Sequence, residues 1–157
     1  MNVTALGRLD FLLGEWEGDG WIMLGRGERR TFHQRETVRS AAGGTVVVID
    51  GLGTSTDAGR EGETVHQAFA VVTYDSATAK LRWRAYRATG EETVAEPMVE
   101  RDTLVWGMEL GPGGRGGRIR FTIRRTATGE WNEIGEMIAP DANGRITKFF
   151  EMTLKRR

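Results

Sequence analysis

The chain has 157 residues, a length that suits one domain with a single buried core. Its 22 basic and 22 acidic residues give zero net charge, which excludes a general electrostatic attraction to nucleic acid or anionic membranes. It has no cysteine, which excludes disulfide bonds, thiolate catalysis and cysteine metal sites.

The sequence also carries expectations about location. The first residues lack the basic and apolar regions of a secretory signal, and no run of about 18 apolar residues follows. We therefore expect a cytoplasmic protein with neither a membrane nor a nucleic acid as partner.

The opening stretch, LDFLLGEWEGDGWIM, joins an apolar segment to a strand. Leu9 and Leu12 follow helical spacing, which predicts a short helix that closes one end of the fold, with Trp16 beneath it. Gly14 can end this helix, because glycine adopts backbone conformations that other residues avoid. Gly18 and Gly20 would let the first strand bend.

After residue 13 the apolar residues alternate with period two, and Gly-, Asn- and Asp-rich links interrupt them. Such alternation predicts about ten strands. We place them near residues 15–24, 29–39, 44–53, 63–74, 79–88, 92–99, 102–109, 117–126, 130–139 and 145–156. Short links and the lack of a second helix predict one domain, residues 1–157. We expect an all-β, antiparallel, up-and-down barrel of the lipocalin or fatty-acid-binding-protein type, because closure removes exposed edges.

Alternation also assigns the interior of the barrel. Arg82 and Arg84 alternate with Leu81 and Trp83, and arginine is costly to bury, so the apolar rows should face inward. A barrel this wide should hold a cavity, and apolar walls with a few polar groups suit a small hydrophobic ligand. The predicted ligand-binding residues are Trp83, Trp106, Phe121, Met137, Phe150, Met152 and Gln67. Further polar residues predicted to face inward are Gln34, Glu36 and Glu133.

Strand 63–74 is nearly apolar on both faces. A second copy of the chain could cover its outer face, so we also consider a homodimer. A barrel filled by its own side chains, acting only through dimerisation, is one alternative to a binding protein.

Five segments carry a family resemblance: LDFLLGEWEGDG, FHQRETV, VVTYDSATAKLRWRAY, GEWNEIGEM and DANGRITKFFEMTLKRR. Together they resemble the lipocalin-like DUF1579 family of the calycin group and, more distantly, the nitrobindin barrels. The resemblance implies a closed barrel with a helix across one end, and a cation over Trp16, from Lys155 or Arg157. Nitrobindin-like members bind haem through a histidine near the C-terminus. Here Phe149–Glu151 stand at that position and the last strand has no histidine, so we expect no haem and no other cofactor. Haem binding that depends on His66 is the remaining outside alternative.

Two carboxylates are the candidates for catalysis. Glu133 and Glu36 could face inward with raised pKa values and serve as the base of a barrel isomerase, cyclase or hydrolase. The plainer interpretation is that an arginine neutralises each of them. Of the two histidines, His33 shares a face with arginines and should meet solvent, whereas His66 should be structural or lie at an interface. We expect no metal site. Binding of a small hydrophobic or amphipathic molecule, without catalysis, is the leading hypothesis.

Overall fold

The computed structural model describes residues 3–25 and 27–157. A short helical segment, α1 (Val3–Leu6) followed by the 3-10 turn η1 (Gly7–Leu12), precedes a single antiparallel sheet of eleven strands. The strands are β1 (Gly14–Leu24), β2 (Glu28–Ala41), β3 (Val46–Ser55), β4 (Thr64–Asp75), β5 (Lys80–Arg87), β6 (Glu92–Ala95), β7 (Met98–Glu100), β8 (Thr103–Glu109), β9 (Arg118–Arg125), β10 (Trp131–Ile138) and β11 (Ile146–Arg156). Two further short 3-10 turns cover Ala42–Gly44 and Pro112–Gly114. No helix within the described ranges is long and apolar enough to cross a membrane.

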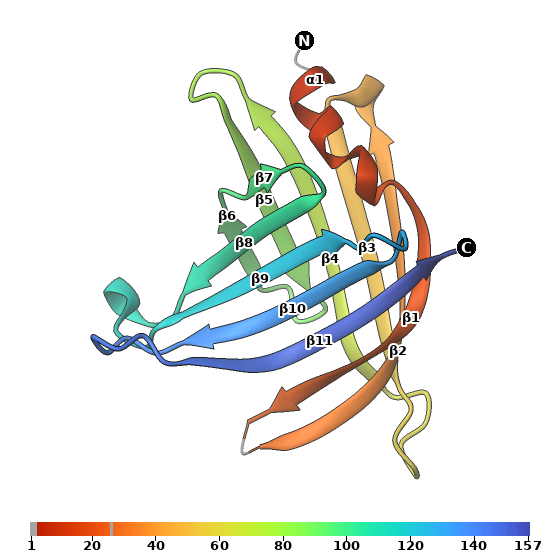
Figure 1. The fold of residues 1–157 in the computed structure, drawn as a ribbon, viewed down its shortest axis with the longest axis vertical. Helices are drawn as coiled ribbons and strands as arrows, with labels where there is room; N and C mark the ends of the chain where they lie inside the picture. Colours follow the sequence, from red (N-terminus) through yellow and green to blue (C-terminus); the bar gives the residue numbers. More distant parts are fainter. Residues whose placement is uncertain (1–2, 26) are drawn as a thin grey trace.

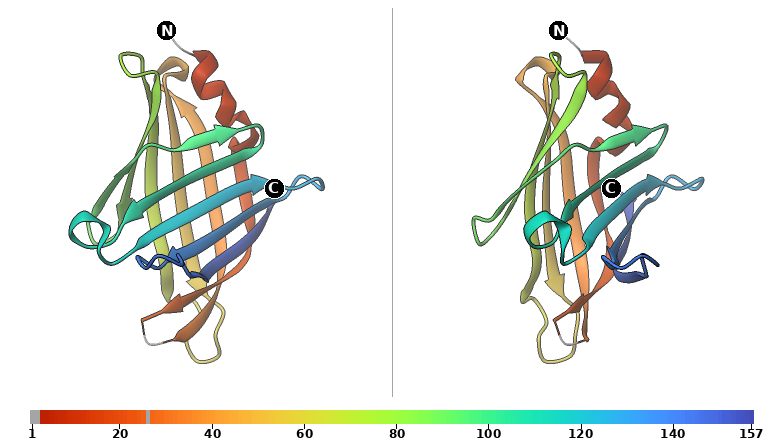
Figure 2. Two further views of the ribbon diagram at one scale, coloured as in Figure 1. Left: turned by 60° about the vertical axis from the view of Figure 1, so that its left-hand side comes forward. Right: turned by 90° about the vertical axis from the view of Figure 1, so that its left-hand side faces the viewer.

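The sheet is strongly curled, so that its two halves face each other. In Figure 1 strands β2–β5 run from top to bottom, while β8–β11 cross them at a steep angle, and the turned views of Figure 2 show the same arrangement. The order of the strands is β6-β5-β4-β3-β2-β1-β11-β10-β9-β8-β7. The prediction of an all-β, antiparallel, up-and-down fold is therefore confirmed.

The two edges of the sheet meet at a seam. Edge strands β6 and β7 follow each other in sequence, yet the hydrogen-bonded ladder does not continue from one to the other. Glu96 and Pro97 separate them, and proline has no N–H to donate to a ladder. The single strand predicted over residues 92–99 is thus two short strands. The hydrogen-bonded ladder is therefore open at this seam, and the sheet is curled like a barrel without being closed by hydrogen bonds.

The N-terminal segment covers one end of the curled sheet (Figure 1). Leu9 and Leu12 are buried in the core, as predicted. Trp16, only 1% exposed, donates its indole Nε1–H to the carbonyl oxygen of Leu12 at 2.7 Å. The Trp16 ring also meets the ring of Trp131 edge-on, with centroids 5.8 Å apart. The segment and Trp16 therefore form one packed unit.

Glycines let the first strand approach its neighbour closely. Gly14 has φ +127°, a conformation that few other residues adopt, at the point where the helical segment gives way to β1. A Cβ atom at Gly18 would collide with the Thr153 carbonyl oxygen, and one at Gly20 would lie 2.7 Å from the Glu151 carbonyl oxygen. The predicted bend is therefore better described as close contact between β1 and β11.

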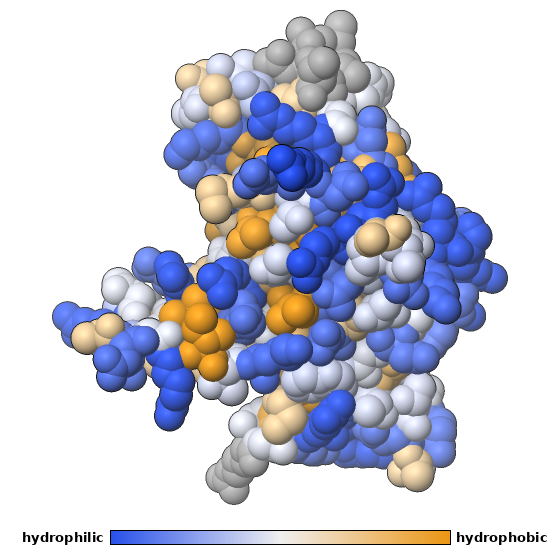
Figure 3. Space-filling view, in the orientation of Figure 1, coloured by the Kyte–Doolittle hydropathy of each residue, from blue (hydrophilic) through white to orange (hydrophobic). Residues whose placement is uncertain are grey.

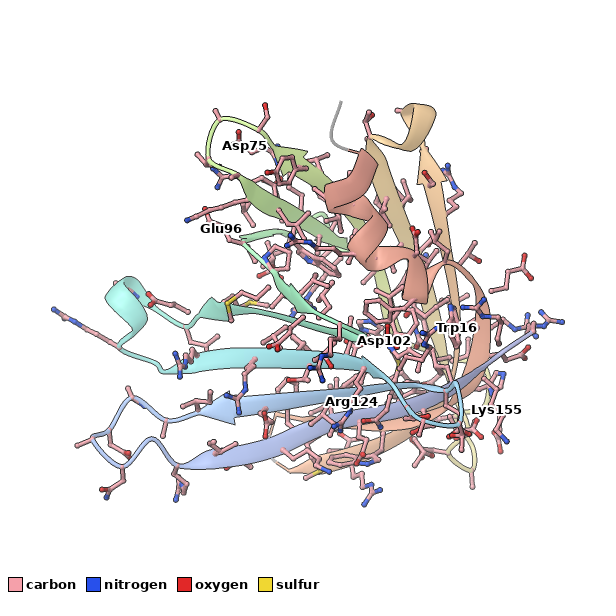
Figure 4. The ribbon with its side chains drawn as sticks, turned by 45° about the horizontal axis from the view of Figure 1, so that its top comes forward. Trp16, Asp75, Glu96, Asp102, Arg124 and Lys155 are labelled. Atoms are coloured by element: carbon pink, nitrogen blue, oxygen red, sulfur yellow. The ribbon has the colours of Figure 1, made fainter. Side chains whose placement is uncertain are left out.

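Arg156 is the cation that covers Trp16, so the expectation of Lys155 or Arg157 is wrong. The Arg156 Cζ atom lies 4.7 Å from the centroid of the Trp16 ring. The ladder pairs Trp16 with Arg156, which puts both side chains on one face of the sheet. Lys155 and Arg157 belong to the opposite face, where each pairs with a glutamate; Trp16 and Lys155 are labelled in Figure 4.

Replacing Arg156 with glutamine should lower the free energy of unfolding by about 1 kcal/mol, because it removes the cation from the Trp16 ring. Lys155→Gln is the matched control and should change the stability by less than about 0.5 kcal/mol, since its ion pair is exposed. Urea unfolding of both variants measures the difference. Equal losses in the two variants would contradict the assignment of Arg156.

The outer surface carries the charges that the arginine rows predicted. Leu81 and Trp83 of β5 are buried, whereas Arg82 between them bonds Asp75 at 3.2 Å and Glu96 at 2.7 Å on the outside. Figure 4 labels these two acidic residues near the β4–β5 hairpin. The face in Figure 3 is mainly hydrophilic, with hydrophobic residues in small separate patches. Alternation thus assigned the faces of β5 correctly.

Candidate functional site

A cavity of about 360 Å³ lies inside the curled sheet. This volume suits a small organic molecule. Its lining is mostly aromatic and aliphatic and comes from strands of both halves of the sheet. Leu24, Tyr86, Arg87 and Met137 line it and are themselves exposed, so they form its rim. Five of the predicted ligand-binding residues line the cavity: Trp83, Trp106, Phe121, Met137 and Phe150.

An aromatic stack forms one wall. Trp106 lies between Trp83 and Phe121, with ring centroids 4.8 and 4.7 Å apart and the ring planes within 22°. Phe150 meets Phe121 edge-on at 5.9 Å. Trp83 is on β5 and Trp106 is on β8, strands that do not share a hydrogen-bonded ladder. The stack therefore joins the two halves of the sheet across the seam while it lines the cavity.

Gln67 and Met152 lie outside the cavity, contrary to prediction. Gln67 is exposed on the outer face of β4, because His66, Ala68 and Ala70 are the residues that point inward. The small side chains of the two alanines leave the space that the cavity occupies. Met152 is buried, but it belongs to the packed core and does not line the cavity.

Three buried polar side chains lie inside the barrel, as predicted: Gln34, Glu36 and Glu133. Gln34 Nε2 donates a hydrogen bond to Glu36 Oε1 at 2.7 Å, and Trp131 Nε1 donates one to Glu133 Oε2 at 3.2 Å. No arginine or lysine of the described residues bonds either carboxyl group. The interpretation that an arginine neutralises each carboxylate is therefore wrong.

Burial changes the protonation of this pair. It raises the pKa of Glu36 to about 8, and the negative charge of Glu133 adds to the effect, while the hydrogen bond from Gln34 opposes it. Burial also raises the pKa of Glu133 to about 7, against the hydrogen bond from Trp131. Both carboxyl groups consequently exchange protons near neutral pH, where a general acid or base works best.

Two glycines that sequence reasoning missed make room for these polar groups. Gly51 and Gly53 of β3 pair with Glu36 and Gln34 of β2. A Cβ atom at Gly51 would collide with Glu36 Oε1, and one at Gly53 would collide with Gln34 Oε1. The available signal was the segment DGLG, where two glycines alternate on one face of a strand otherwise rich in valine.

The wall also presents hydrogen-bonding atoms without protein partners. Trp83 Nε1 and Trp106 Nε1 are buried and donate to no acceptor within the described part of the chain. Buried donors of this kind are normally bonded. The rings of both tryptophans line the cavity, but neither nitrogen is itself exposed to it.

The two histidines have different surroundings. His66 lines the cavity, and burial together with the charge of Arg87 lowers its pKa to about 4, so its ring is neutral at pH 7. His33 lies on the outer surface, where it bonds Glu17 at 2.7 Å and Asp19 at 2.9 Å. Hydrogen bonds to Asp19 and then Glu17 raise the pKa of His33. No cluster suited to a metal ion occurs among residues 3–25 and 27–157.

The last strand does not fit the haem site that the nitrobindin resemblance implies. Phe149 and Phe150 both line the cavity where a histidine ligand would be needed. A bulge in the pairing of β10 with β11 brings these consecutive residues to the same side. Phe150 also stacks on Phe32, with centroids 5.8 Å apart. A haem bound through this strand would therefore lack its ligand.

Comparisons with known proteins support the fold alone. No protein-family model matches the sequence, and no curated protein sequence matches it significantly. The structure is similar to the crystal structure of Rv2717c from M. tuberculosis, with a TM-score of 0.67 over 98% of this chain and 97% of that chain. The two sequences are 15% identical. At that identity the likeness extends to the curled antiparallel sheet and carries no assignment of function.

Proposed function

We propose that the protein binds a small hydrophobic or amphipathic molecule in the cavity. The observation that carries this proposal is a cavity of about 360 Å³ lined by the Trp83–Trp106–Phe121 stack. Well-formed apolar pockets with a few polar groups are typical ligand sites. A barrel filled by its own side chains would lack such a space, so this alternative is less well supported.

Replacing Ala68 with phenylalanine should weaken ligand binding at least tenfold, because the ring would occupy the cavity. Quenching of tryptophan fluorescence by a panel of fatty acids, flavonoids, long-chain alcohols and long-chain amines measures the binding. Gln67→Ala is the matched control on the same strand. It should bind as the unmodified protein does, since Gln67 lies on the outer face.

The panel also tests the proposal itself. If the unmodified protein binds no member of it, the binding function is wrong. If Ala68→Phe keeps its stability and still binds normally, the ligand occupies a site other than this cavity. Native mass spectrometry of protein from its own source would identify a retained ligand directly.

Proton transfer on a bound ligand is a second candidate function. It is favoured by the two carboxyl groups, which are buried beside the cavity, have raised pKa values and lack a cationic partner in the described chain. Such a pair could remove a proton at one carbon of a ligand and return it at another, as an isomerase or cyclase requires.

Deuterium exchange separates this candidate from simple binding. A ligand identified by mass spectrometry is incubated with the protein in deuterated water. Proton transfer predicts deuterium in the ligand with the unmodified protein, and at least tenfold slower incorporation with Glu133→Gln or Glu36→Gln. A ligand that binds but gains no deuterium would leave binding alone as the function.

A homodimer remains a prediction from the sequence. Leu52 and Phe69 are 41% and 38% exposed on the outer faces of β3 and β4, the surface that a second copy would cover. Light scattering of the purified protein tests this prediction.

A further inference from the structure

The two interior carboxyl groups differ from the other partly buried acidic groups in having no cation beside them. Asp57 pairs with the buried Arg30 at 2.7 Å, and Glu136 pairs with Arg120 at 2.8 Å on the outer face of β10. Glu36 and Glu133 bond only the neutral groups of Gln34 and Trp131 among the described residues. Buried ionised carboxylates are usually paired with a positive charge, so this pair can ionise inside the cavity near neutral pH only beside a cation that the ligand brings.

Among residues 3–25 and 27–157, no other ionisable group that lines the cavity supplies that positive charge to its interior. Three more titratable residues line it: His66, Tyr86 and Arg87. Arg87 is exposed at the rim and pairs with Glu91 at 3.4 Å, and Tyr86 donates its hydroxyl to Glu92 at 3.0 Å.

The remaining titratable groups supply no positive charge inside the cavity either. His66 is neutral at pH 7 because burial and Arg87 lower its pKa. Asp50 of β3 adds a further negative charge that acts on Glu36. The cavity therefore combines an apolar wall with an acidic pair and has no interior cation within the described residues.

We propose that the cavity binds an amphipathic organic cation, whose protonated amine meets Glu36 and Glu133 and whose apolar body lies along the Trp83–Trp106–Phe121 wall. This inference rests on the proposed binding function and narrows it to one ligand class. An ammonium group donates strong, charge-assisted hydrogen bonds to carboxylates. Once ionised, the same carboxyl pair repels the carboxylate of a fatty acid.

Protonation gives this ligand class a distinct signature. A primary amine stays protonated up to about pH 10, whereas the Glu36 and Glu133 pair loses its protons between about pH 7 and 8. Binding of the cation favours the ionised carboxylates, so it releases protons into the buffer near pH 7. Affinity for an amine should therefore rise from pH 6 to pH 8, and affinity for a carboxylate should fall over the same range.

The test compares octylamine, octanol and octanoate, which share a chain length and differ in charge. Tryptophan fluorescence gives the dissociation constants at pH 6 and pH 8, and calorimetry in two buffers of different ionisation enthalpy counts the protons released. At pH 8 octylamine should bind at least about tenfold more tightly than octanol, and octanoate more weakly than both. The amine preference should shrink at pH 6.

Single glutamine variants locate the effect. Glu36→Gln and Glu133→Gln keep the shape of the side chain and remove its charge, so each should lose most of the preference for octylamine over octanol. Glu136→Gln, on the outer face of the same strand as Glu133, should retain the preference. The pH series on the unmodified protein tests the inference even if a variant fails to fold.

The outcomes separate this inference from the proposed function. Octanoate binding as tightly as octylamine, or an amine preference intact in both interior variants, would overturn the cation proposal and leave the ligand-binding function standing. Binding of none of the three probes would overturn both proposals.

Discussion

Replacing Trp16 with alanine is expected to lower the free energy of unfolding by about 3 kcal/mol or more. The side chain is fully buried, and its removal would leave a large space between the N-terminal segment and the sheet. It would also leave the Leu12 carbonyl oxygen without its indole donor and Trp131 without its edge-on neighbour. Unfolding in urea, followed by far-UV circular dichroism, measures the loss.

Two further variants divide this effect into its parts. Trp16→Phe keeps an aromatic ring but removes the hydrogen bond to Leu12, so about 1 kcal/mol should be lost through that bond. Trp21→Ala, on the outer face of the same strand, removes a ring that contacts Arg29 at 4.5 Å and should cost less than half as much as Trp16→Ala. Equal losses for Trp16→Ala and Trp21→Ala would show that the N-terminal segment does not depend on Trp16.

Much of the fold was predictable because apolar and charged residues alternate along several strands. In β5 one face carries Arg82 and Arg84 and the other carries Leu81 and Trp83. Only one orientation of the strand buries the apolar pair and leaves the arginines in water. The leucine spacing before Gly14 likewise predicts the helical segment that the structure contains. Both faces of strand β4 are largely apolar, so alternation does not show which of them faces inward. The prediction that Gln67 faces inward is therefore wrong. The inward face of β4 follows from its register with β5, which pairs Val72 with the buried Trp83 and Ala70 with Ala85, and alternation alone does not supply this register.

The candidate site was harder to predict, because its groups meet across the interior. Alternation placed Glu36 and Glu133 inside correctly, but it could not identify their partners. The abundance of arginine suggested ion pairs, whereas the structure gives Gln34 and Trp131. The space for the Glu36 carboxyl depends on Gly51, a residue on the neighbouring strand. The pairing register, which sequence alone does not supply, connects these positions.

The interior carboxyl pair should make the protein less stable as the pH rises. The pKa of Glu36 is raised from an ordinary value of 4.5 to about 8, and that of Glu133 to about 7. Between pH 4.5 and 8 the folded chain therefore holds protons that the unfolded chain has lost, so the free energy of unfolding falls with increasing pH. The penalty is absent below pH 4.5, grows through this range, and is complete above pH 8.

The double variant Glu36→Gln/Glu133→Gln isolates this penalty from other titrations. His33, whose pKa is raised by its two acidic partners, also loses stabilising interactions as the pH rises, and His66, with its pKa of about 4, destabilises the fold on acidification. Both contributions persist in the variant. Asp57, whose pKa is lowered to about 2, titrates well below the range from pH 4.5 to pH 8. The difference in stability between the two proteins therefore reports the carboxyl pair alone.

Both pKa values are raised by well over one, and a difference of one corresponds to about 1.4 kcal/mol, so the double variant should exceed the unmodified protein in stability by about 3 kcal/mol or more at pH 8.5. At pH 4.5 the two should be nearly equal, because glutamine resembles a protonated glutamate in shape and polarity. Urea unfolding at half-unit pH steps measures both curves. Parallel stability curves for the two proteins would mean that water or a cation reaches Glu36 and Glu133. Curves that diverge as the pH rises would show that the fold tolerates an unfavourable buried pair. Such tolerance is expected of groups retained for a ligand rather than for stability.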